Sequence, residues 1–514
     1  MTERRVVDRT LLPHSALAAG GTEPVTVVHV AAEFYPYARS GGLAEAVANL
    51  ARFQSRAGVR TVAILPLYRS ARAKAGTLVP FGEPFEVSLG NQTETVRLLA
   101  LADPQSSGTQ LLFLEHDGFY DRPKLYGDSA GDYPDNPLRF GLFALASIMA
   151  LPMITTGPIL LHVHDWHAAL ALAYLKTRFA GDARYRRVAT VLSVHNAGYQ
   201  GHYPPSVLRD LGLPQELFNW RQLEWYGKVN FLKAGLVFAD HVVTVSPNHA
   251  IELRTPEGGF GLQEAFSSLG DRLSGILNGI DGEAWDPRTD EQIAAPFSVE
   301  NPGGKAACKR ALQERFGLTI DPAVPVVGMA ARLVTQKGLD LVIGSYALFE
   351  LPAQFVFIGA GEARFELALG QIAAMMPHRV AVDTDFTDEL EHQVMAGADF
   401  LLMPCQYEPC GLTQMRAQRY GVAPIVRRVG GLADTVEDGV TGFVFDPYEE
   451  ASLVGATLRG IDIYFNPAEW QRILATTMQR DFSWERSVVA YLETYRQVIG
   501  RLEEASGGGT AAWT

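Results

Sequence analysis

Two glycine-containing loops beside cations are the first candidates for chemistry in this sequence. Arg39, Gly41 and Gly42 follow an apolar run and precede the helical pattern of residues 46–55. Paired glycines at the start of a helix let backbone N–H groups approach an anion, and the helix dipole favours negative charge there. A tight strand-to-helix turn uses the same glycines, so the loop is either a phosphate site or a plain turn.

A second loop repeats this arrangement with two cations. Arg332 and Lys337 lie five residues apart, directly after another apolar run, and Gly338 follows them. Both side chains can reach one diphosphate and stabilise the charge that develops as the diphosphate leaves. Exposed arginines and lysines on loops are often only solvated, and this alternative stays open at this point.

A carboxylate and a short loop follow a third apolar run. Glu408 precedes Pro409, which suits the first turn of a helix, and Cys410, Gly411 and Leu412 come next. Glu408 can accept hydrogen bonds from sugar hydroxyls while the amides of Gly411 and Leu412 hold a phosphate. The alternative is a glutamate that only stabilises a helix N-terminus.

Residues 162–167 contain a histidine-rich segment with His162, His164, Asp165 and His167. Alternate residues on a strand share a face, so these side chains could surround a metal ion. No cysteine or carboxylate pattern elsewhere completes such a site, and we therefore predict no metal. His195 directly follows a strand and is better placed for polar contact with a substrate.

A pair of aspartates, Asp383 and Asp385, could also hold a divalent cation. Thr387 and Asp388 begin a helical pattern just beyond them. The segment is therefore predicted to cap a helix.

Two successive sets of strands must position these residues. The first set is expected at residues 26–31, 61–66, 111–115, 159–164, 189–195 and 241–246. The second set is expected at residues 324–330, 354–358, 380–383, 400–404 and 423–427, with helical segments such as 339–349 between them. Alternating strands and helices indicate an α/β fold with two doubly wound parallel sheets. Ligands of such sheets bind beyond the carboxyl ends of the strands, where the candidate residues lie.

The predicted domain boundaries follow from where the first set of strands ends. We expect a first domain over residues 25–275, a second over 276–482, and a C-terminal helix over 483–502 that packs back on the first domain. Residues 1–24 and 503–514 are expected to be flexible tails. The apolar patch near residues 11–19 falls short of the ~20 residues that span a bilayer.

Composition limits the classes of partner. The chain has 514 residues, of which 47% are hydrophobic and 20% charged, enough for two or three globular domains. Its formal net charge of −13 argues against nucleic acid or an anionic membrane as a partner. Three cysteines, Cys308, Cys405 and Cys410, are too few for a disulfide framework and suit the cytoplasm.

Nine stretches, taken together, resemble the bacterial glycogen synthase and plant starch synthase family. They are residues 164–168, 193–201, 230–235, 245–247, 276–281, 332–338, 408–414, 427–435 and 481–484. The resemblance runs from about Val27 to Tyr495. It implies a GT-B fold, in which two Rossmann-like domains face a central cleft, the first on the acceptor side and the second on the nucleotide-sugar side.

The resemblance also implies an activity. Members of this family transfer glucose from a nucleotide sugar, ADP-glucose in the bacterial and plant branch, to the non-reducing 4-hydroxyl of an α-1,4-glucan. The acceptor is glycogen or a malto-oligosaccharide, and configuration is retained without a metal or other cofactor. The leaving nucleotide diphosphate helps to deprotonate the incoming hydroxyl, and the two domains are expected to close on the donor about hinges near Gly275 and residues 482–484.

Roles for the site residues follow from the same resemblance. The donor diphosphate would be bound by Arg39, Gly41, Gly42, Arg332 and Lys337. The transferred glucose would lie near Asp165, His195 and Glu408, with Asn278, Cys410, Gly411 and Leu412 lining the donor site. The residues expected to carry catalysis are Asp165, His195, Arg332, Lys337 and Glu408.

The sequence departs from the family pattern at several of these loops. Arg39 replaces a usual Lys, Glu45 an Asp, and Val429 a Thr, while Cys405 and Gln406 stand where Ser and Arg are common. Arg416 occupies a position where this branch usually has Tyr. Two rival functions stay open at this point: an epimerase or a transferase of another sugar on the same fold, and a glucan-binding protein with little catalysis.

Overall fold

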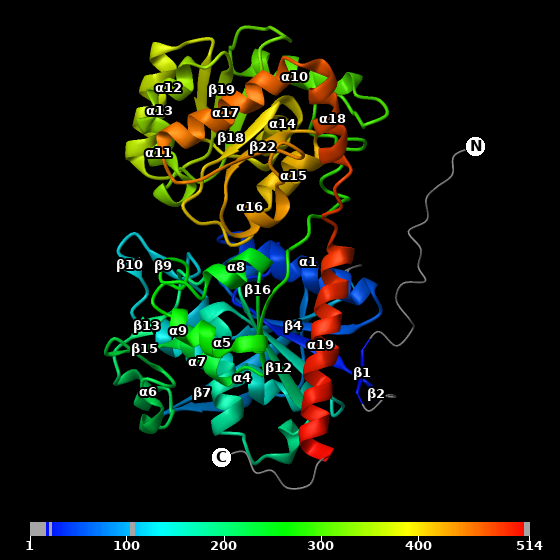
Figure 1. Ribbon diagram of the computed structural model, residues 1–514. Helices are drawn as coiled ribbons and strands as arrows, with labels where there is room; N and C mark the ends of the chain where they lie inside the picture. Colours follow the sequence, from blue (N-terminus) through cyan, green and yellow to red (C-terminus); the bar gives the residue numbers. More distant parts are fainter. Residues whose placement is uncertain (1–16, 20–22, 103–107, 508–514) are drawn as a thin grey trace, which may run out of the picture. The chain divides into compact units, whose positions relative to one another are not determined.

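The chain folds into two compact units, each built on a largely parallel β-sheet (Figure 1). The computed structural model describes residues 17–19, 23–102 and 108–507. Unit 1 comprises the described residues up to Val245, residues 250–276, and the described residues from Trp484 onward. Unit 2 comprises residues 246–249 and 277–483. The chain therefore crosses between units after residues 276 and 483, one residue later than each predicted boundary, and the exchange of residues 246–249 was not predicted.

The sheet of unit 1 has the strand order β17-β16-β12-β11-β3-β4-β8-β7-β5, and β6 pairs with β7. Its parallel strands are β3 (Thr26–Val30), β4 (Arg60–Pro66), β8 (Gln110–Glu115), β11 (Ile159–His164), β12 (Val188–Val194), β16 (His241–Thr244) and β17 (Leu273–Gly275). The antiparallel strands are β5 (Leu78–Pro80), β6 (Phe85–Leu89) and β7 (Gln92–Leu101). Among the parallel strands, taken in chain order, the first lies beside the fourth, which is the arrangement of a Rossmann sheet. The point where the strand order reverses lies between β3 and β11.

Five helices of unit 1 matter most for the site and its support: α1 (Gly42–Arg56), α4 (Asn136–Ile154), α5 (Asp165–Thr177), α7 (Phe231–Phe238) and α19 (Trp484–Gly507). Shorter ones are α2 (Arg69–Lys74), α3 (Asp117–Tyr120), α6 (Val207–Asp210) and α9 (Gln263–Ser268), and α8 (Pro247–Glu252) spans the exchange of units. Small strand pairings involve β1 (Ala18–Ala19), β2 (Glu23–Pro24), β9 (Gly127–Asp128), β10 (Gly131–Asp132), β13 (His202–Tyr203), β14 (Glu224–Trp225) and β15 (Lys228–Asn230).

Among the residues that the structure describes, one helix, α4, is long and apolar enough by length and composition alone to cross a membrane. Its most apolar window is 78% buried, and α4 packs against α5 inside unit 1. Arg139, in the first turn of α4, is fully buried and donates to the carbonyls of Phe119 and Leu125. The burial of α4 is that of a core helix.

The C-terminal helix α19 belongs to unit 1 and packs on its core. It is drawn in red in Figure 1. Trp484, Tyr491 and Tyr495 are buried and pack in one cluster with Leu50 of α1 and Val191 of β12. The helix continues to Gly507, so the predicted tail beginning at residue 503 is wrong for residues 503–507. Glu503, Glu504 and Ala505 favour helix there, and residues 503–506 include no glycine or proline.

The predicted N-terminal tail lies mostly outside the described residues. Within it, β1 and β2 pair antiparallel, and the amide of Val25 donates to the carbonyl of Leu17 at 3.2 Å. The buried Leu17 joins the same cluster as α19, so this part of the predicted tail is fixed to the core.

The sheet of unit 2 has the order β20-β19-β18-β21-β22-β23 and is parallel throughout. Its strands are β18 (Val326–Ala330), β19 (Gln354–Ile358), β20 (Val380–Asp383), β21 (Phe400–Met403), β22 (Ala423–Arg427) and β23 (Phe443–Phe445). In chain order this is 3-2-1-4-5-6, the order of a Rossmann fold, with its switch point between β18 and β21.

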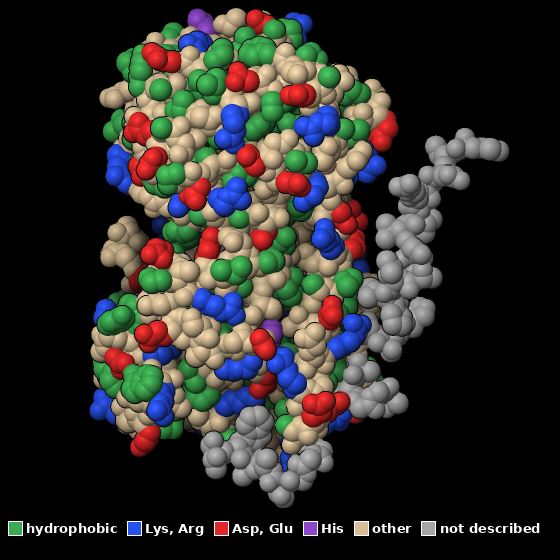
Figure 2. All heavy atoms as spheres, in the orientation of Figure 1, with side chains coloured by type: hydrophobic (Ala, Val, Ile, Leu, Met, Phe, Trp, Pro, Cys, Tyr) green, Lys and Arg blue, Asp and Glu red, His purple; other side chains and the backbone are tan. Residues whose placement is uncertain are grey.

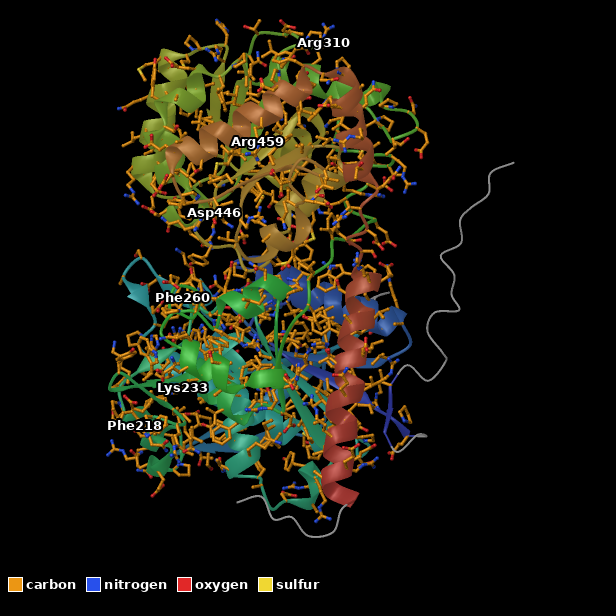
Figure 3. The ribbon with its side chains drawn as sticks, viewed as in Figure 1. Phe218, Lys233, Phe260, Arg310, Asp446 and Arg459 are labelled. Atoms are coloured by element: carbon orange, nitrogen blue, oxygen red, sulfur yellow. The ribbon has the colours of Figure 1, made fainter. Side chains whose placement is uncertain are left out.

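The helices of unit 2 are α10 (Gly303–Arg315), α11 (Leu339–Gly344), α12 (Tyr346–Glu350), α13 (Ala363–Met375), α14 (Asp388–Gly397), α15 (Thr413–Arg419), α16 (Gly430–Thr435), α17 (Glu450–Tyr464) and α18 (Pro467–Met478). The helix predicted over residues 339–349 is broken into α11 and α12, because Ser345 leaves the helical region and Gly344 favours helix weakly. Arg459 of α17, labelled in Figure 3, donates to the carbonyl of Val444 and ties α17 to the edge strand β23.

Candidate active site

In unit 1, the loop between β3 and α1 places Arg39, Gly41 and Gly42 at the carboxyl end of a strand beside the switch point. Arg39 is exposed, and its guanidinium lies 3.2 Å from the carboxylate of Glu45. A Cβ added to Gly41 or Gly42 would meet no heavy atom of the described residues within 4 Å. Packing therefore does not require glycine at either position, and the open space is what a close anion would fill.

Glu33, to which we assigned no role from the sequence, organises this loop. Its buried carboxylate accepts hydrogen bonds from the Ser40 amide at 2.6 Å, the Ser40 hydroxyl at 2.5 Å and the Tyr126 hydroxyl at 2.7 Å. The Gly41 amide also lies 3.4 Å from this carboxylate. Glu33 thus fixes the entry to α1 while leaving the later amides of its first turn available.

Asp165 stands at the end of β11, on the other side of the same switch point. Its φ of 53° is in the left-handed region, which a non-glycine residue rarely adopts. Its carboxylate accepts the backbone amide of His195 at 2.7 Å. Burial raises the pKa of Asp165 from 3.8 to about 7, although hydrogen bonds from the amides of His195 and Asn196 oppose the shift. Strain and a perturbed pKa together are typical of a functional carboxylate.

His195 follows β12 and is half-buried. The structure brings it to Asp165 through the backbone and to His164 through the ring, with 3.0 Å between His195 Nε2 and His164 Nδ1. Burial lowers the pKa of His195 to about 4, so the ring is neutral near pH 7. A neutral ring exchanges hydrogen bonds with a hydroxyl and does not add charge.

The histidine-rich segment forms a different cluster from the one considered above. His162 and His164 meet His29 of β3, and ring nitrogens of all three lie within 4.8 Å of one another, close enough in principle for a metal ion. Every nitrogen of the three rings also has a hydrogen-bond partner. His167 instead stacks on Trp166 with ring centroids 4.0 Å apart. His29 was missed because it lies 135 residues from His164 in the sequence.

In unit 2, Arg332 and Lys337 follow β18, at the switch point of the second sheet. Arg332 is exposed, whereas Lys337 is largely buried. Gly338 ends this loop with φ of 79°, and a Cβ there would lie 2.1 Å from the carbonyl oxygen of Pro404. Glycine is therefore required at residue 338, because the backbone of the next loop passes directly against it.

Glu408 follows β21, the other strand at this switch point, and its carboxylate pairs with the ammonium of Lys337. Burial acts to lower the pKa of Lys337, but the adjacent Glu408 carboxylate outweighs this effect and the pKa is raised. Lys337 is therefore a cation held in a partly desolvated position. Lys337 and Glu408, which are 71 positions apart, are thus in contact, and the sequence analysis predicted both to bind the same donor.

The loop after Glu408 packs on a glycine pair. A Cβ on Gly430 would lie 1.9 Å from the carbonyl oxygen of Glu408, and one on Gly431 would lie 2.1 Å from that of Cys410. The Gly431 amide donates to the Glu408 carbonyl at 3.1 Å. This glycine pair therefore serves close packing of two loops and holds Glu408 in place.

The remaining predicted donor-site residues lie on or beside this loop. Gly411 has φ of 69°, and Leu412 directly precedes α15. Cys410 is buried, which raises the pKa of its thiol to about 12. The backbone amide of Asn278 bonds to Cys410, and the Asn278 side-chain oxygen is buried with no partner among the described residues. Asn278 and Cys410 therefore lie side by side, and the unpaired oxygen is available to a ligand group.

Departures from the family pattern have local explanations in the structure. Arg416 pairs with Glu391 at 3.0 Å and lies over the ring of Trp285, with 4.4 Å from Cζ to the centroid. Cys405 is buried, and its thiol lies 3.6 Å from the Glu408 carboxylate. Val429 occupies the N-cap of α16 and makes no capping hydrogen bond, whereas a threonine could make one.

Other motif residues support the fold. Asn230 caps α7 by accepting the Lys233 amide, and the Lys233 ammonium donates to the carbonyls of Trp220 and Glu224 (Figure 3 labels Lys233). A Cβ on Gly235 would lie 2.9 Å from Ala169 of α5, so this glycine allows the two helices to pack closely.

The segment with the aspartate pair caps a helix, as expected, but the capping residue is Thr387 and not an aspartate. Thr387 caps α14 by accepting the amide of Leu390, and the side chain of Asp383 accepts the amide of Asp385.

Two Rossmann-like units, with candidate donor-binding residues at both switch points, define the GT-B fold of a glycosyltransferase. Residues 26–268 match the family described as the starch synthase catalytic domain, and residues 312–461 match glycosyl transferases group 1. The chain is 40% identical to a glycogen synthase of Syntrophotalea carbinolica over 484 residues, covering 92% of this chain and 99% of that one. It is 38% identical to a glycogen synthase of Thermodesulfovibrio yellowstonii, covering 93% and 99%. The chain belongs to the glycogen synthase and starch synthase family.

Solved structures agree with this assignment. The catalytic domain of starch synthase IV from Arabidopsis thaliana, bound to ADP and acarbose, has a TM-score of 0.83 at 30% identity, covering 93% of this chain and 100% of that one. Sucrose-phosphate synthase from Thermosynechococcus elongatus has a TM-score of 0.58 at 19% identity and shares the fold. The predicted fold class, family and enzyme class are confirmed.

Proposed function

We propose that this enzyme transfers glucose from ADP-glucose to the non-reducing 4-hydroxyl of an α-1,4-glucan with retention of configuration. The observation that carries the proposal is the pairing of Lys337 with Glu408 at the switch point of the sheet in unit 2. At this point a cation can bind the diphosphate of a nucleotide-sugar donor, and a carboxylate can bind the hydroxyls of its sugar.

The donor would rearrange this ion pair. Diphosphate oxygens would take the Lys337 ammonium, with the exposed Arg332 beside them, and would free Glu408 to accept hydrogen bonds from sugar hydroxyls. Because the cations are fixed before the bond breaks, they stabilise the charge that develops on the leaving ADP. Cys410, Gly411, Leu412 and Asn278 would line the same donor site.

Unit 1 supplies a second set of polar groups. Arg39 and the open amides near Gly41 and Gly42 suit phosphate, and Asp165 and His195 suit sugar hydroxyls. In the proposed retaining reaction, an oxygen of the leaving diphosphate receives the proton of the attacking 4-hydroxyl. The hydroxyl oxygen then bonds to the anomeric carbon on the face that ADP leaves, so no protein nucleophile is required.

The choice between donors is tested by nucleotide release. ADP-glucose and UDP-glucose are supplied in turn, with and without glycogen, and free ADP or UDP is measured. We expect fast release from ADP-glucose only when glycogen is present. A strong preference for UDP-glucose would overturn the proposed donor. Sugar conversion without acceptor would indicate an epimerase, and glucan binding without nucleotide release a non-catalytic protein.

We also propose that the reaction needs no metal ion. In unit 2, Arg332 and Lys337 can meet the charge of the diphosphate, a task that Mg²⁺ performs in many other transferases. Activity should therefore persist in excess EDTA. Loss of activity that only Mg²⁺ or Mn²⁺ restores would contradict this proposal.

The proposals on location and other partners rest on the cysteines and on the surface charge. All three cysteines are free and buried, as suits a reducing cytoplasm. On the face drawn in Figure 2, basic and acidic side chains are interspersed over both units, which does not favour a polyanionic partner such as nucleic acid or an anionic membrane. We propose a cytoplasmic enzyme whose partners are the nucleotide sugar and the glucan.

A further inference from the structure

A chain of hydrogen bonds runs from His195 through the core of unit 1 to the C-terminal helix α19. His195 Nε2 lies 3.0 Å from His164 Nδ1, and His164 Nε2 lies 3.0 Å from His29 Nδ1. His29 Nε2 then lies 2.8 Å from Gln54 Oε1 on α1. The amide nitrogen of Gln54 donates to the hydroxyl of Tyr495 on α19 at 3.0 Å. Five side chains from separate elements are thus connected in series.

The chain continues beyond Tyr495. The Tyr495 hydroxyl lies 2.7 Å from His162 Nδ1, and His162 Nε2 lies 2.7 Å from the Ser193 hydroxyl. His29, Gln54, His162, His164 and Tyr495 all have zero exposed surface. These side chains therefore bond to one another and not to solvent. Leaving one of their polar groups unpaired would cost folding free energy.

The rings in this chain are neutral. Burial lowers the pKa of His29 and of His195 to about 4, and lowers those of His162 and His164 well below the ordinary value. A neutral imidazole has one N–H donor and one bare nitrogen that accepts. Because each link needs one donor, the N–H groups must all point in the same direction along the chain.

The orientation of the Gln54 amide selects that direction. Its oxygen faces His29, so His29 carries its hydrogen on Nε2 and accepts on Nδ1. His164 must then donate from Nε2 to His29 and accept on Nδ1. His195 in turn donates from Nε2, and its Nδ1 is left bare.

We propose that Gln54 and Tyr495 are positioning residues that hold His195 in the Nε2–H tautomer, with Nδ1 presented as an acceptor for a hydroxyl of the sugar. Tyr495 acts by accepting the Gln54 amide hydrogen and giving its own hydroxyl hydrogen to His162 Nδ1, an arrangement that matches an amide oxygen facing His29. This role rests on the proposed glucosyl transfer. It links helix α19 to a ring that the proposed transfer would use.

The variants are chosen to break the chain at known links. Gln54→Met keeps the volume of the side chain and removes both the oxygen and the nitrogen of its amide. Gln54→Glu keeps an oxygen that accepts from His29 in either protonation state. Tyr495→Phe removes only a hydroxyl. Tyr174→Phe is the matched control, because its hydroxyl is equally buried and bonds to the Leu211 carbonyl at 2.8 Å, outside this chain.

The first readout is the tautomer itself. Full-length protein with ¹⁵N at both ring nitrogens of histidine gives nitrogen shifts that distinguish a protonated from a bare nitrogen. The His195 signals are assigned by their loss in His195→Asn. We expect Nε2–H in the wild type, in Gln54→Glu and in Tyr174→Phe, and a mixture of tautomers in Gln54→Met and Tyr495→Phe.

The second readout is steady-state kinetics with ADP-glucose and glycogen. Gln54→Met and Tyr495→Phe should lower kcat about two- to tenfold, the effect of one net hydrogen bond, with KM for ADP-glucose nearly unchanged. Gln54→Glu should retain most of kcat. Tyr174→Phe should lower thermal stability as much as Tyr495→Phe does and leave kcat within about twofold.

Two results would overturn the proposal: an Nδ1–H tautomer of His195 in the wild type, or a tautomer that neither Gln54→Met nor Tyr495→Phe changes. If Gln54→Met does not fold, Tyr495→Phe still decides the question. If the wild type transfers no glucose, the proposed function fails, but the nitrogen shifts still test the control of the tautomer.

Discussion

Replacing Asp165 with Asn should stabilise the protein above neutral pH and damage its activity. Asp165 is buried, and its pKa is raised from 3.8 to about 7, mainly by that burial. Between pH 3.8 and about pH 7, Asp165 keeps its proton in the folded chain and has lost it in the unfolded chain. The free energy of unfolding therefore falls as pH rises through this window and levels off above about pH 7.

The size of the effect follows from the shift. A shift of about three pKa units corresponds to about 4 kcal/mol, at about 1.4 kcal/mol per unit. Asparagine has the same shape, carries no charge, and has an oxygen that can accept the His195 amide. The stability gain of Asp165→Asn over the wild type should therefore rise from about 0.5 kcal/mol at pH 4 to at most about 4 kcal/mol at pH 8.

The assay is urea unfolding of the wild type and the variant at a series of pH values, with hydrogen exchange of peptides from β11 and β12 as the probe of unit 1. Subtracting wild type from variant cancels the titration of groups common to both. Asp240→Asn is the control, because the Asp240 carboxylate pairs with Lys176 at 2.8 Å and its removal should lower stability. A gain for Asp165→Asn that does not change with pH, or a loss at pH 8, would refute the reasoning.

Four further substitutions have defined outcomes. Glu408→Gln should lower turnover more than donor binding, and equal loss of both would limit Glu408 to a structural role. Without the Glu408 carboxylate, burial should lower the pKa of Lys337, so the affinity for ADP should fall at alkaline pH in titration calorimetry. Gly338→Ala should cost about 1–3 kcal/mol in urea unfolding, whereas Gly42→Ala should not destabilise the protein and should weaken ADP-glucose binding. Val429→Thr should add about 0.5–1 kcal/mol by capping α16, and an unchanged unfolding midpoint would contradict this.

Buried parallel strands were the most predictable part of the fold. β11, β19, β20 and β22 begin and end where the sequence placed them, because a strand covered on both faces is a continuous apolar run between polar turns. β7 was missed because its first four residues, 92–95, are polar, and it pairs antiparallel at the side of the sheet. Short strands such as β17 and β23 have only three residues and leave no clear pattern.

The candidate site was predictable where residues follow strands at a switch point. Arg332, Lys337 and Glu408 were singled out because each comes soon after an apolar run, and topology then brings Lys337 and Glu408 into contact. Glu33 and His29 were not found, because their roles depend on partners 93 and 135 residues away. Such contacts are set by the packing of the sheet, which a single sequence does not display.

The measurement that tests the account most directly is transfer of labelled glucose from ADP-glucose to glycogen, followed by digestion of the polymer with β-amylase, which cleaves only α-1,4 links from the non-reducing end. We predict that the label enters the polymer in excess EDTA and is released as labelled maltose. Label that stays out of the polymer, or that enters it in a form β-amylase does not release, would contradict the proposed α-1,4-glucosyl transfer.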